Sequence, residues 1–106
     1  MAKSNAERRS SRRLTTSAPV NVRHMRRQLM GTARDISTNG MFLISEARIE
    51  EGADIELVLM MPPELRPKGG RWMSCHAKVV RVEDQGREGE YGIAAKILYC
   101  ESVDVL

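Results

Sequence analysis

The chain has 106 residues, of which 17 are lysine or arginine, 14 are aspartate or glutamate and 42% are apolar, a size that fits one small domain. Only four residues are aromatic, so the composition predicts a folded chain with a mostly aliphatic core and excludes one that is disordered throughout. No apolar run reaches the roughly 18 residues of a membrane helix, and the arginine-rich start lacks a signal-peptide core, so we expect a soluble, cytoplasmic protein without a membrane span.

The charge is distributed unevenly along the chain. Residues 1–34 carry nine basic side chains and one acid, a balance of +8, whereas residues 35–106 carry eight basic and thirteen acidic side chains, a balance of −5. A basic excess at one end is typical of a segment that contacts nucleic acid, an anionic membrane or a phosphorylated small molecule. A solvated tail has the same composition, so charge alone leaves both interpretations open.

The sequence pattern divides the chain into three parts. Residues 1–19 are rich in serine, threonine and arginine and nearly free of apolar side chains, which predicts a flexible basic arm. From Val20 the apolar residues recur with period two, the spacing at which successive side chains leave a strand on opposite faces. We therefore predict a folded domain over residues 20–98 and a tail over 99–106 that contains at most a short helix.

Six segments within the folded domain have strand-like alternation or strand-forming residues. They are 20–26, 28–35, 41–45, 54–61, 71–82 and 91–98. Turn-forming residues separate them at 35–40, in the proline- and glycine-rich stretch 62–70 and at 84–89. Short strands without a convincing helix predict an all-β fold, and a six-stranded antiparallel barrel is favoured because closure removes exposed sheet edges.

Signals for catalysis or metal binding are weak. Cys75 and Cys100 form no CxxC pair and match no zinc spacing, so we expect reduced, partly buried thiols. His24 and His76 belong to no HExxH motif, and neither GxSxG nor a Walker motif occurs. We therefore predict that the protein is not an enzyme and has neither a cofactor nor a metal site. Trp72 follows the proline- and glycine-rich stretch and is expected to pack at a barrel end.

Two polar clusters flank the first two predicted strands. The first contains Arg8, Arg9, Arg12 and Arg13, and the second is Asp35-Ile36-Ser37-Thr38-Asn39-Gly40. In this order they resemble the two motifs of the PilZ family of cyclic di-GMP receptors: RxxxR, matched by Arg9 and Arg13, and [D/N]xSxxG, matched by Asp35, Ser37 and Gly40. The likeness covers about residues 7–98, including the strands at 77–81 and 91–97, although the family often ends in a clear helix.

The resemblance implies a PilZ-type barrel that binds cyclic di-GMP through Arg8, Arg9, Arg12, Arg13, Asp35, Ser37 and Gly40, with the arm ordering over the ligand. These residue types suit two phosphates and two guanines. Arginine can bind phosphate, pair with guanine O6 and N7 or stack on a base. An aspartate accepts the N–H groups of guanine, a serine adds a hydroxyl bond, and glycine permits close backbone approach or a positive φ.

In the family, an arginine at the position of Arg8 accompanies the binding of two intercalated ligand molecules, so we expect that stoichiometry here. Arg23, Arg26, Arg27 and Arg34 either add positive potential on the same side or belong to a solvated face.

The resemblance implies an effector protein as partner, with motility or exopolysaccharide production among the possible outputs. Two other functions remain to be tested: a small nucleic-acid-binding barrel and an interaction adapter without a ligand. The first lacks interleaved basic and aromatic residues, and the second is disfavoured by the intact motif residues.

Overall fold

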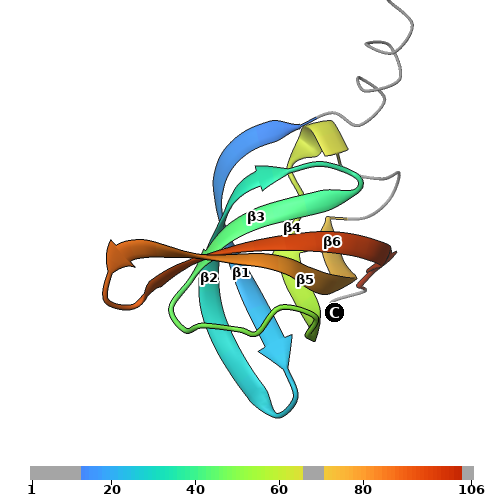
Figure 1. Ribbon diagram of the computed structural model, residues 1–106. Coiled ribbons are helices and arrows are strands. Elements are labelled where there is room, and N and C mark those ends of the chain that lie inside the picture. Colours follow the sequence, from blue (N-terminus) through green and yellow to red (C-terminus); the bar gives the residue numbers. More distant parts are fainter. Residues whose placement is uncertain (1–12, 66–70, 104–106) are drawn as a thin grey trace, which may run out of the picture.

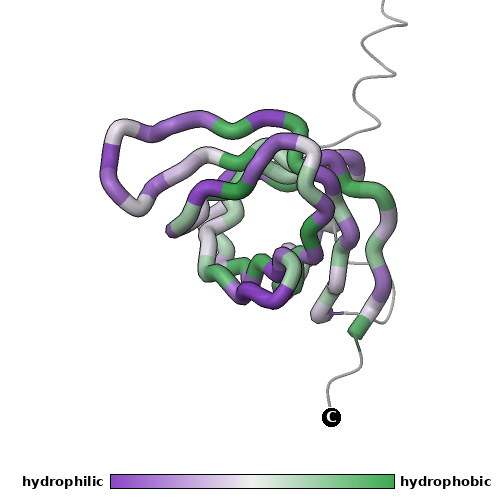
Figure 2. Tube along the Cα trace, turned by 60° about the horizontal axis from the view of Figure 1, so that its bottom comes forward, coloured by the Kyte–Doolittle hydropathy of each residue, from purple (hydrophilic) through white to green (hydrophobic). Residues whose placement is uncertain are grey.

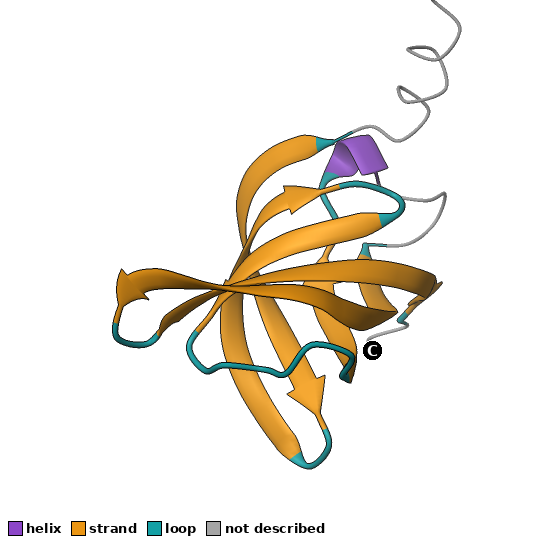
Figure 3. Cartoon of the chain, viewed as in Figure 1, coloured by secondary structure: helices purple, strands orange, loops and turns teal. Residues whose placement is uncertain are grey.

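The computed structural model describes residues 13–65 and 71–103, and most of them lie in strands (Figures 1 and 3). The strands are β1 (Leu14–His24), β2 (Arg27–Ile36), β3 (Gly40–Ser45), β4 (Asp54–Met60), β5 (Trp72–Arg87) and β6 (Glu90–Ser102). One short 3₁₀ helix, Pro63–Leu65, follows β4. None of the helices in this part of the chain is long and apolar enough to cross a membrane.

The six strands close into a ring in the order β1-β2-β3-β6-β5-β4, and β1 pairs with β4 to complete it. Every neighbouring pair is antiparallel. The all-β fold and the six-stranded antiparallel barrel predicted from the sequence are therefore confirmed. Strand β6 ends at Ser102, and no helix follows it before the described residues end at Val103.

Three predicted strand ends differ from the structure. Strand β1 begins at Leu14 rather than Val20, β6 ends at Ser102 rather than Leu98, and β5 continues to Arg87, so that only Glu88 and Gly89 of the predicted turn at 84–89 lie outside the strands. These extensions are polar segments whose backbones pair although few of their side chains are buried, so apolar alternation cannot reveal them. The predicted flexible arm spans residues 1–19; residues 14–19 of it lie in β1, and residues 1–12 lie outside the described residues.

The barrel interior is filled by aliphatic side chains, as the composition predicts. Its largest fully buried side chains are Ile36, Leu43, Ile49, Leu57, Leu59 and Ile93. Among the described residues the buried core contains no aromatic side chain. Figure 2 looks into the ring that these side chains fill. Burying each large aliphatic side chain contributes roughly 1.5–3 kcal/mol, so this core is the main source of stability.

Several strand pairs contain a β-bulge or similar irregularity, and two of these, in β2 and β5, interrupt inward–outward alternation near the charged residues Asp35 and Arg81. In β2, Ala33 and Ile36 both face the core, and the pairing with β3 shifts between Ala33 and Asp35. In β5, the pairing with β6 shifts between Val79 and Arg81. Because a bulge inserts one extra residue, every side chain beyond it points to the opposite face from the one that regular alternation would give. Asp35 and Arg81 are thereby turned to the outside of the barrel.

The prediction of reduced thiols is contradicted, because Cys75 and Cys100 form a disulfide and no described cysteine is free. The two residues are direct cross-strand partners in the β5–β6 pair. The sequence-based prediction used only local spacing and the expected compartment, whereas the pairing follows from the register of two strands that are distant in the sequence. Cys75 is fully buried and Cys100 partly buried, so the bond lies at the edge of the core.

We expect reduction of this disulfide to lower the free energy of unfolding by about 2–4 kcal/mol, because the bond restricts the unfolded chain across a sequence separation of 25 residues. Urea unfolding with and without excess dithiothreitol measures the change. The double variant Cys75→Ala/Cys100→Ala serves as the control and should not respond to the reductant. Two titratable thiols in the native, unreduced protein would contradict the prediction.

Candidate functional site

A cavity of about 370 Å³ lies on the outer face of the barrel, over the ends of β2 and β3 and the middle of β5 and β6. We call it the Asp35 cavity. Its lining residues are Arg13, Asp35, Ile36, Ser37, Gly40, Met41, Phe42, Arg81, Glu83, Ala94 and Ala95. Residues from the first strand pair, the motif turn and the β5–β6 hairpin are thus brought to one surface.

A row of directly opposed residues crosses this surface. Its members, from β1 to β5, are Thr15, Asp35, Phe42, Ala94 and Arg81. Because neighbouring strands are about 4.8 Å apart, Asp35 and Arg81 are separated by roughly 14 Å along the row. The carboxylate and the guanidinium therefore stand at opposite sides of the cavity, with an aromatic ring and a small side chain between them.

Asp35 is held at its position by both neighbouring strands. It pairs with Thr15 of β1 and Phe42 of β3, and the Thr15 hydroxyl donates a hydrogen bond to Asp35 Oδ1 at 3.5 Å. Within the described part of the chain, this one long bond leaves other lone pairs of the carboxylate open. Asp35 can therefore accept hydrogen bonds from a ligand without losing its structural contact.

The turn after β2 is organised by the Ser37 side chain. Its Oγ accepts hydrogen bonds from the backbone N–H groups of Asn39 (3.3 Å) and Gly40 (3.2 Å) and donates to the Gly40 carbonyl at 3.3 Å. The Ser37 backbone N–H also donates to that carbonyl, at 2.9 Å. Ser37 therefore closes the turn, a role the sequence did not reveal; its predicted bond to the ligand remains a prediction.

The backbone of Gly40 does not have a positive φ, so its conformation does not require glycine. A close contact with the neighbouring strand does. A Cβ added there would meet the Ala95 carbonyl oxygen at 3.2 Å. The absent side chain lets β3 start directly against β6, where Gly40 pairs with Lys96. Of the two sequence-based explanations for this glycine, the positive φ is wrong and close approach of the backbone to the ligand stays a prediction; close packing of β3 against β6 is a third reason that the geometry shows.

We expect Ser37→Ala to lower the free energy of unfolding by about 1 kcal/mol, because two backbone N–H groups of the turn lose their acceptor. The matched control is Thr38→Ala, an exposed neighbour in the same turn, which should change stability by less than about 0.5 kcal/mol. Urea denaturation followed by circular dichroism measures both. Equal effects for the two variants would contradict the role assigned to Ser37.

Four predicted site residues line the same cavity: Arg13, Asp35, Ser37 and Gly40. The remaining three, Arg8, Arg9 and Arg12, lie outside the described residues. In the sequence these three precede Arg13, which lines the cavity, by one to five positions.

Sequence reasoning missed Phe42, Arg81 and Glu83 as lining residues of this cavity. The sequence did contain a signal that Arg81 lies on the outer surface. Strict alternation after Ala77 and Val79 would bury its guanidinium in the core. A buried, unpaired charge is costly, so the pattern itself calls for a bulge near Val80. The same reasoning applies to Asp35, which follows the inward-facing Ala33.

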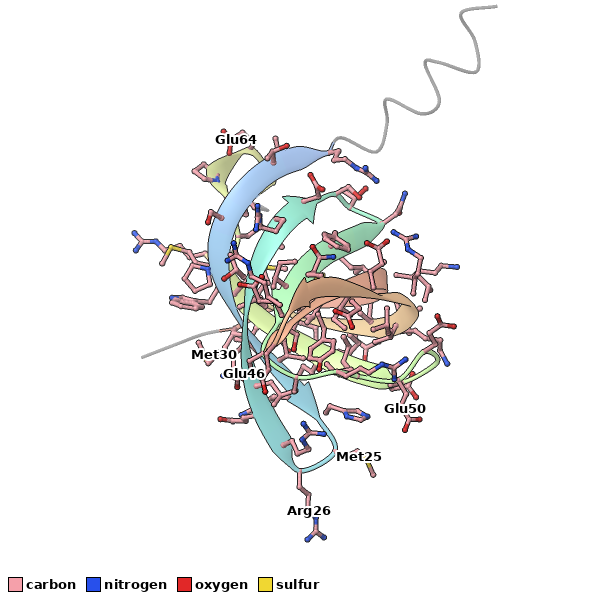
Figure 4. The ribbon with its side chains drawn as sticks, turned by 60° about the vertical axis from the view of Figure 1, so that its left-hand side comes forward. Met25, Arg26, Met30, Glu46, Glu50 and Glu64 are labelled. Atoms are coloured by element: carbon pink, nitrogen blue, oxygen red, sulfur yellow. A yellow bond between two sulfur atoms is a disulfide. The ribbon has the colours of Figure 1, made fainter. Side chains whose placement is uncertain are left out.

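A neighbouring cavity of about 350 Å³ shares Asp35 and Phe42 with the Asp35 cavity. We call it the Arg34 cavity, because Arg34 is its one cation among the described lining residues; Thr15, Ile44 and Gln85 also line it. The sequence analysis considered Arg23, Arg26, Arg27 and Arg34 as further sources of positive potential. Of these, Arg34 adjoins the Asp35 cavity. Arg26 is labelled in Figure 4 at the far end of the β1–β2 hairpin, where His24 pairs with Arg27.

A larger cavity, about 650 Å³, lies elsewhere on the barrel, around Glu56. The Ser74 hydroxyl bonds Glu56 at 2.7 Å and Arg23 contacts it at 3.3 Å. These hydrogen bonds, the one from Ser74 first, lower the pKa of the Glu56 carboxyl against the opposing effect of burial. Among its described lining residues two acids face one cation, so we do not assign an anionic ligand to it.

Other residues considered from the sequence lie away from the Asp35 cavity. The side chain of Trp72 is 37% exposed and its residue pairs with Met60, another exposed apolar residue. The His76 ring stacks on Tyr99 with ring centroids 4.5 Å apart. Within the described ranges, no group of three or more histidine, cysteine, aspartate or glutamate side chains could hold a metal ion.

Comparison with known proteins gives the family. The model of the PilZ domain matches residues 7–97, and the chain therefore belongs to the PilZ family. No curated protein is significantly similar in sequence to the chain.

Two solved structures share the fold. The Bacillus subtilis inhibitor of motility, MotI/DgrA, is 15% identical with a TM-score of 0.69; the match covers 86% of this chain but 43% of that protein, so the chain spans less than half of its length. The PilZ domain of YcgR from Escherichia coli, solved with c-di-GMP, is 14% identical with a TM-score of 0.63, and the match covers 86% of this chain and 78% of that one.

Proposed function

We propose that this protein is a non-catalytic receptor for cyclic di-GMP that acts on a separate effector protein. The observation that carries the proposal is the Asp35 cavity, which gathers Arg13, Asp35, Ser37 and Gly40 in a chain of the PilZ family. The YcgR domain that shares the fold was solved with c-di-GMP. Family and cavity together support this ligand over a general polyanion.

The chemistry of the cavity fits a guanine dinucleotide. The open lone pairs of Asp35 suit the N1–H and N2–H₂ donors of guanine, and the exposed Arg13 can bind phosphate or a base edge. Arg9 lies four residues before Arg13 in the sequence, so an extended chain would carry it at most about 14 Å further. Arg8, Arg9 and Arg12 are thus within reach of a ligand in this cavity.

We also propose that two ligand molecules bind. Two cavities of about 370 and 350 Å³ lie side by side and share Asp35 and Phe42 as a common wall. Arg34 supplies an additional cation on this side, and in the family an arginine at the position of Arg8 accompanies this stoichiometry. A pair of intercalated dinucleotides needs such an extended surface, with arginine planes that can stack on bases.

Ligand binding then changes the conformation of the basic segment that precedes β1, and the changed surface regulates an effector, with motility or exopolysaccharide production as candidate outputs. MotI/DgrA, which shares the fold, is an inhibitor of motility. The proposal includes a cytoplasmic location, in which the Cys75–Cys100 disulfide would be an exception to the reduced thiols usual in that compartment. Ordering of a segment on ligand binding is a common switching mechanism because it exchanges conformational freedom for a defined surface.

Isothermal titration calorimetry with cyclic di-GMP tests the site. We expect Arg9→Ala and Arg13→Ala each to weaken binding about tenfold or more, because each removes charge-assisted hydrogen bonds to phosphate or guanine. The matched control is Arg26→Ala at the far end of the hairpin, which should change the affinity less than twofold. A stoichiometry near two is expected for the wild type.

The outcomes separate the proposals. A stoichiometry near one would contradict the two-molecule mode alone. Binding that survives both arginine substitutions would contradict the site. No heat for the wild type would contradict the function and favour an adapter without a ligand, whereas tighter binding of a single-stranded oligonucleotide would favour a nucleic-acid-binding barrel.

A further inference from the structure

An ion pair lies inside the Asp35 cavity. Arg81 Nε and Glu83 Oε2 are 2.8 Å apart, and both residues line the cavity. Neither sequence motif of the family includes them. The two side chains leave the same face of β5 because they are two residues apart beyond the bulge near Val80.

The cavity is open around this pair. Arg81 lies opposite Ala94, a small residue that also lines the cavity, whereas Glu83 lies opposite Gly92, whose surface is covered by the Phe42 ring and the Gln85 side chain. The Arg81 side chain is 58% exposed and that of Glu83 is 43% exposed. A ligand that enters the cavity can therefore reach the guanidinium directly.

The charge of the described cavity is balanced. Its two arginines, Arg13 and Arg81, face two carboxylates, Asp35 and Glu83. Asp35 is on β2, across two intervening strands from Arg81, and has its own contact with Thr15. Glu83 is therefore the group that neutralises Arg81.

We propose that Arg81 is a further ligand-binding residue and that Glu83 competes with the ligand for its guanidinium. This inference rests on the proposed function. A phosphate and a carboxylate bind the same N–H donors of arginine. A phosphate that binds Arg81 would have to displace Glu83 or lie beside its negative charge. Glu83 therefore lowers the affinity of the cavity for the ligand.

The test is calorimetric titration of the full chain with cyclic di-GMP at about 50 mM and about 500 mM salt. Glu83→Gln keeps the size of the side chain and removes its charge, and we expect it to tighten binding about three- to tenfold at low salt. The gain should shrink at high salt, because exposed charges are screened. Arg81→Ala should weaken binding about tenfold.

Two controls connect the effect to Arg81. Glu90→Gln removes a carboxylate from the same hairpin that contacts Arg87 at 4.0 Å and does not line the cavity, and it should change the affinity less than twofold. In the Arg81→Ala background, Glu83→Gln should no longer tighten binding. A gain that persists there would show a general charge effect and overturn the proposal.

Weaker binding by Glu83→Gln would also overturn it, since Glu83 would then be a hydrogen-bond acceptor for the ligand. Unchanged binding would overturn it while leaving the proposed function in place. Absence of binding by the wild type and all variants would overturn both.

Discussion

A strand of a closed barrel sends every second side chain into the core, and the site of this protein depends on two places where that rule is interrupted. The bulges near Arg34 and Val80 reverse the alternation of β2 and β5. Without the first, Asp35 would face the core and Ile36 the solvent. Without the second, the charge of Arg81 would be buried. The same displacement therefore protects the aliphatic core and places polar groups on the outer surface.

The order of strands in the ring then brings these groups together. β2 and β5 are separated by β3 and β6, so Asp35 and Arg81 stand on the two sides of a surface whose centre is Phe42 and Ala94. The turn closed by Ser37 shapes one rim, and Arg13 approaches from the start of β1. The described positive and negative charges of the cavity balance. Strong attraction for a dianionic ligand therefore has to come from Arg8, Arg9 and Arg12 or from breaking the ion pair between Arg81 and Glu83.

Much of the fold could be predicted from the sequence, since alternation of aliphatic residues identified six strands and the turn-forming residues between them. The site motifs predicted four residues that share one cavity. The disulfide could not be predicted, because Cys75 and Cys100 meet only through the register of β5 with β6. The polar strand ends gave no alternation to detect. Arg81 and Glu83 were missed because their outward position requires a bulge, although an arginine at an inward position was a signal for one.

The central claim is that residues from both bulged strands form one ligand site. The most direct test is to record the backbone amide resonances of ¹⁵N-labelled protein while cyclic di-GMP is added. The account predicts that the largest shifts occur together at residues 35–42, 81–83 and 92–95, with little change at the hairpin 24–27 or around Glu56. Shifts confined to β2 and β3, or centred on Glu56, would contradict it.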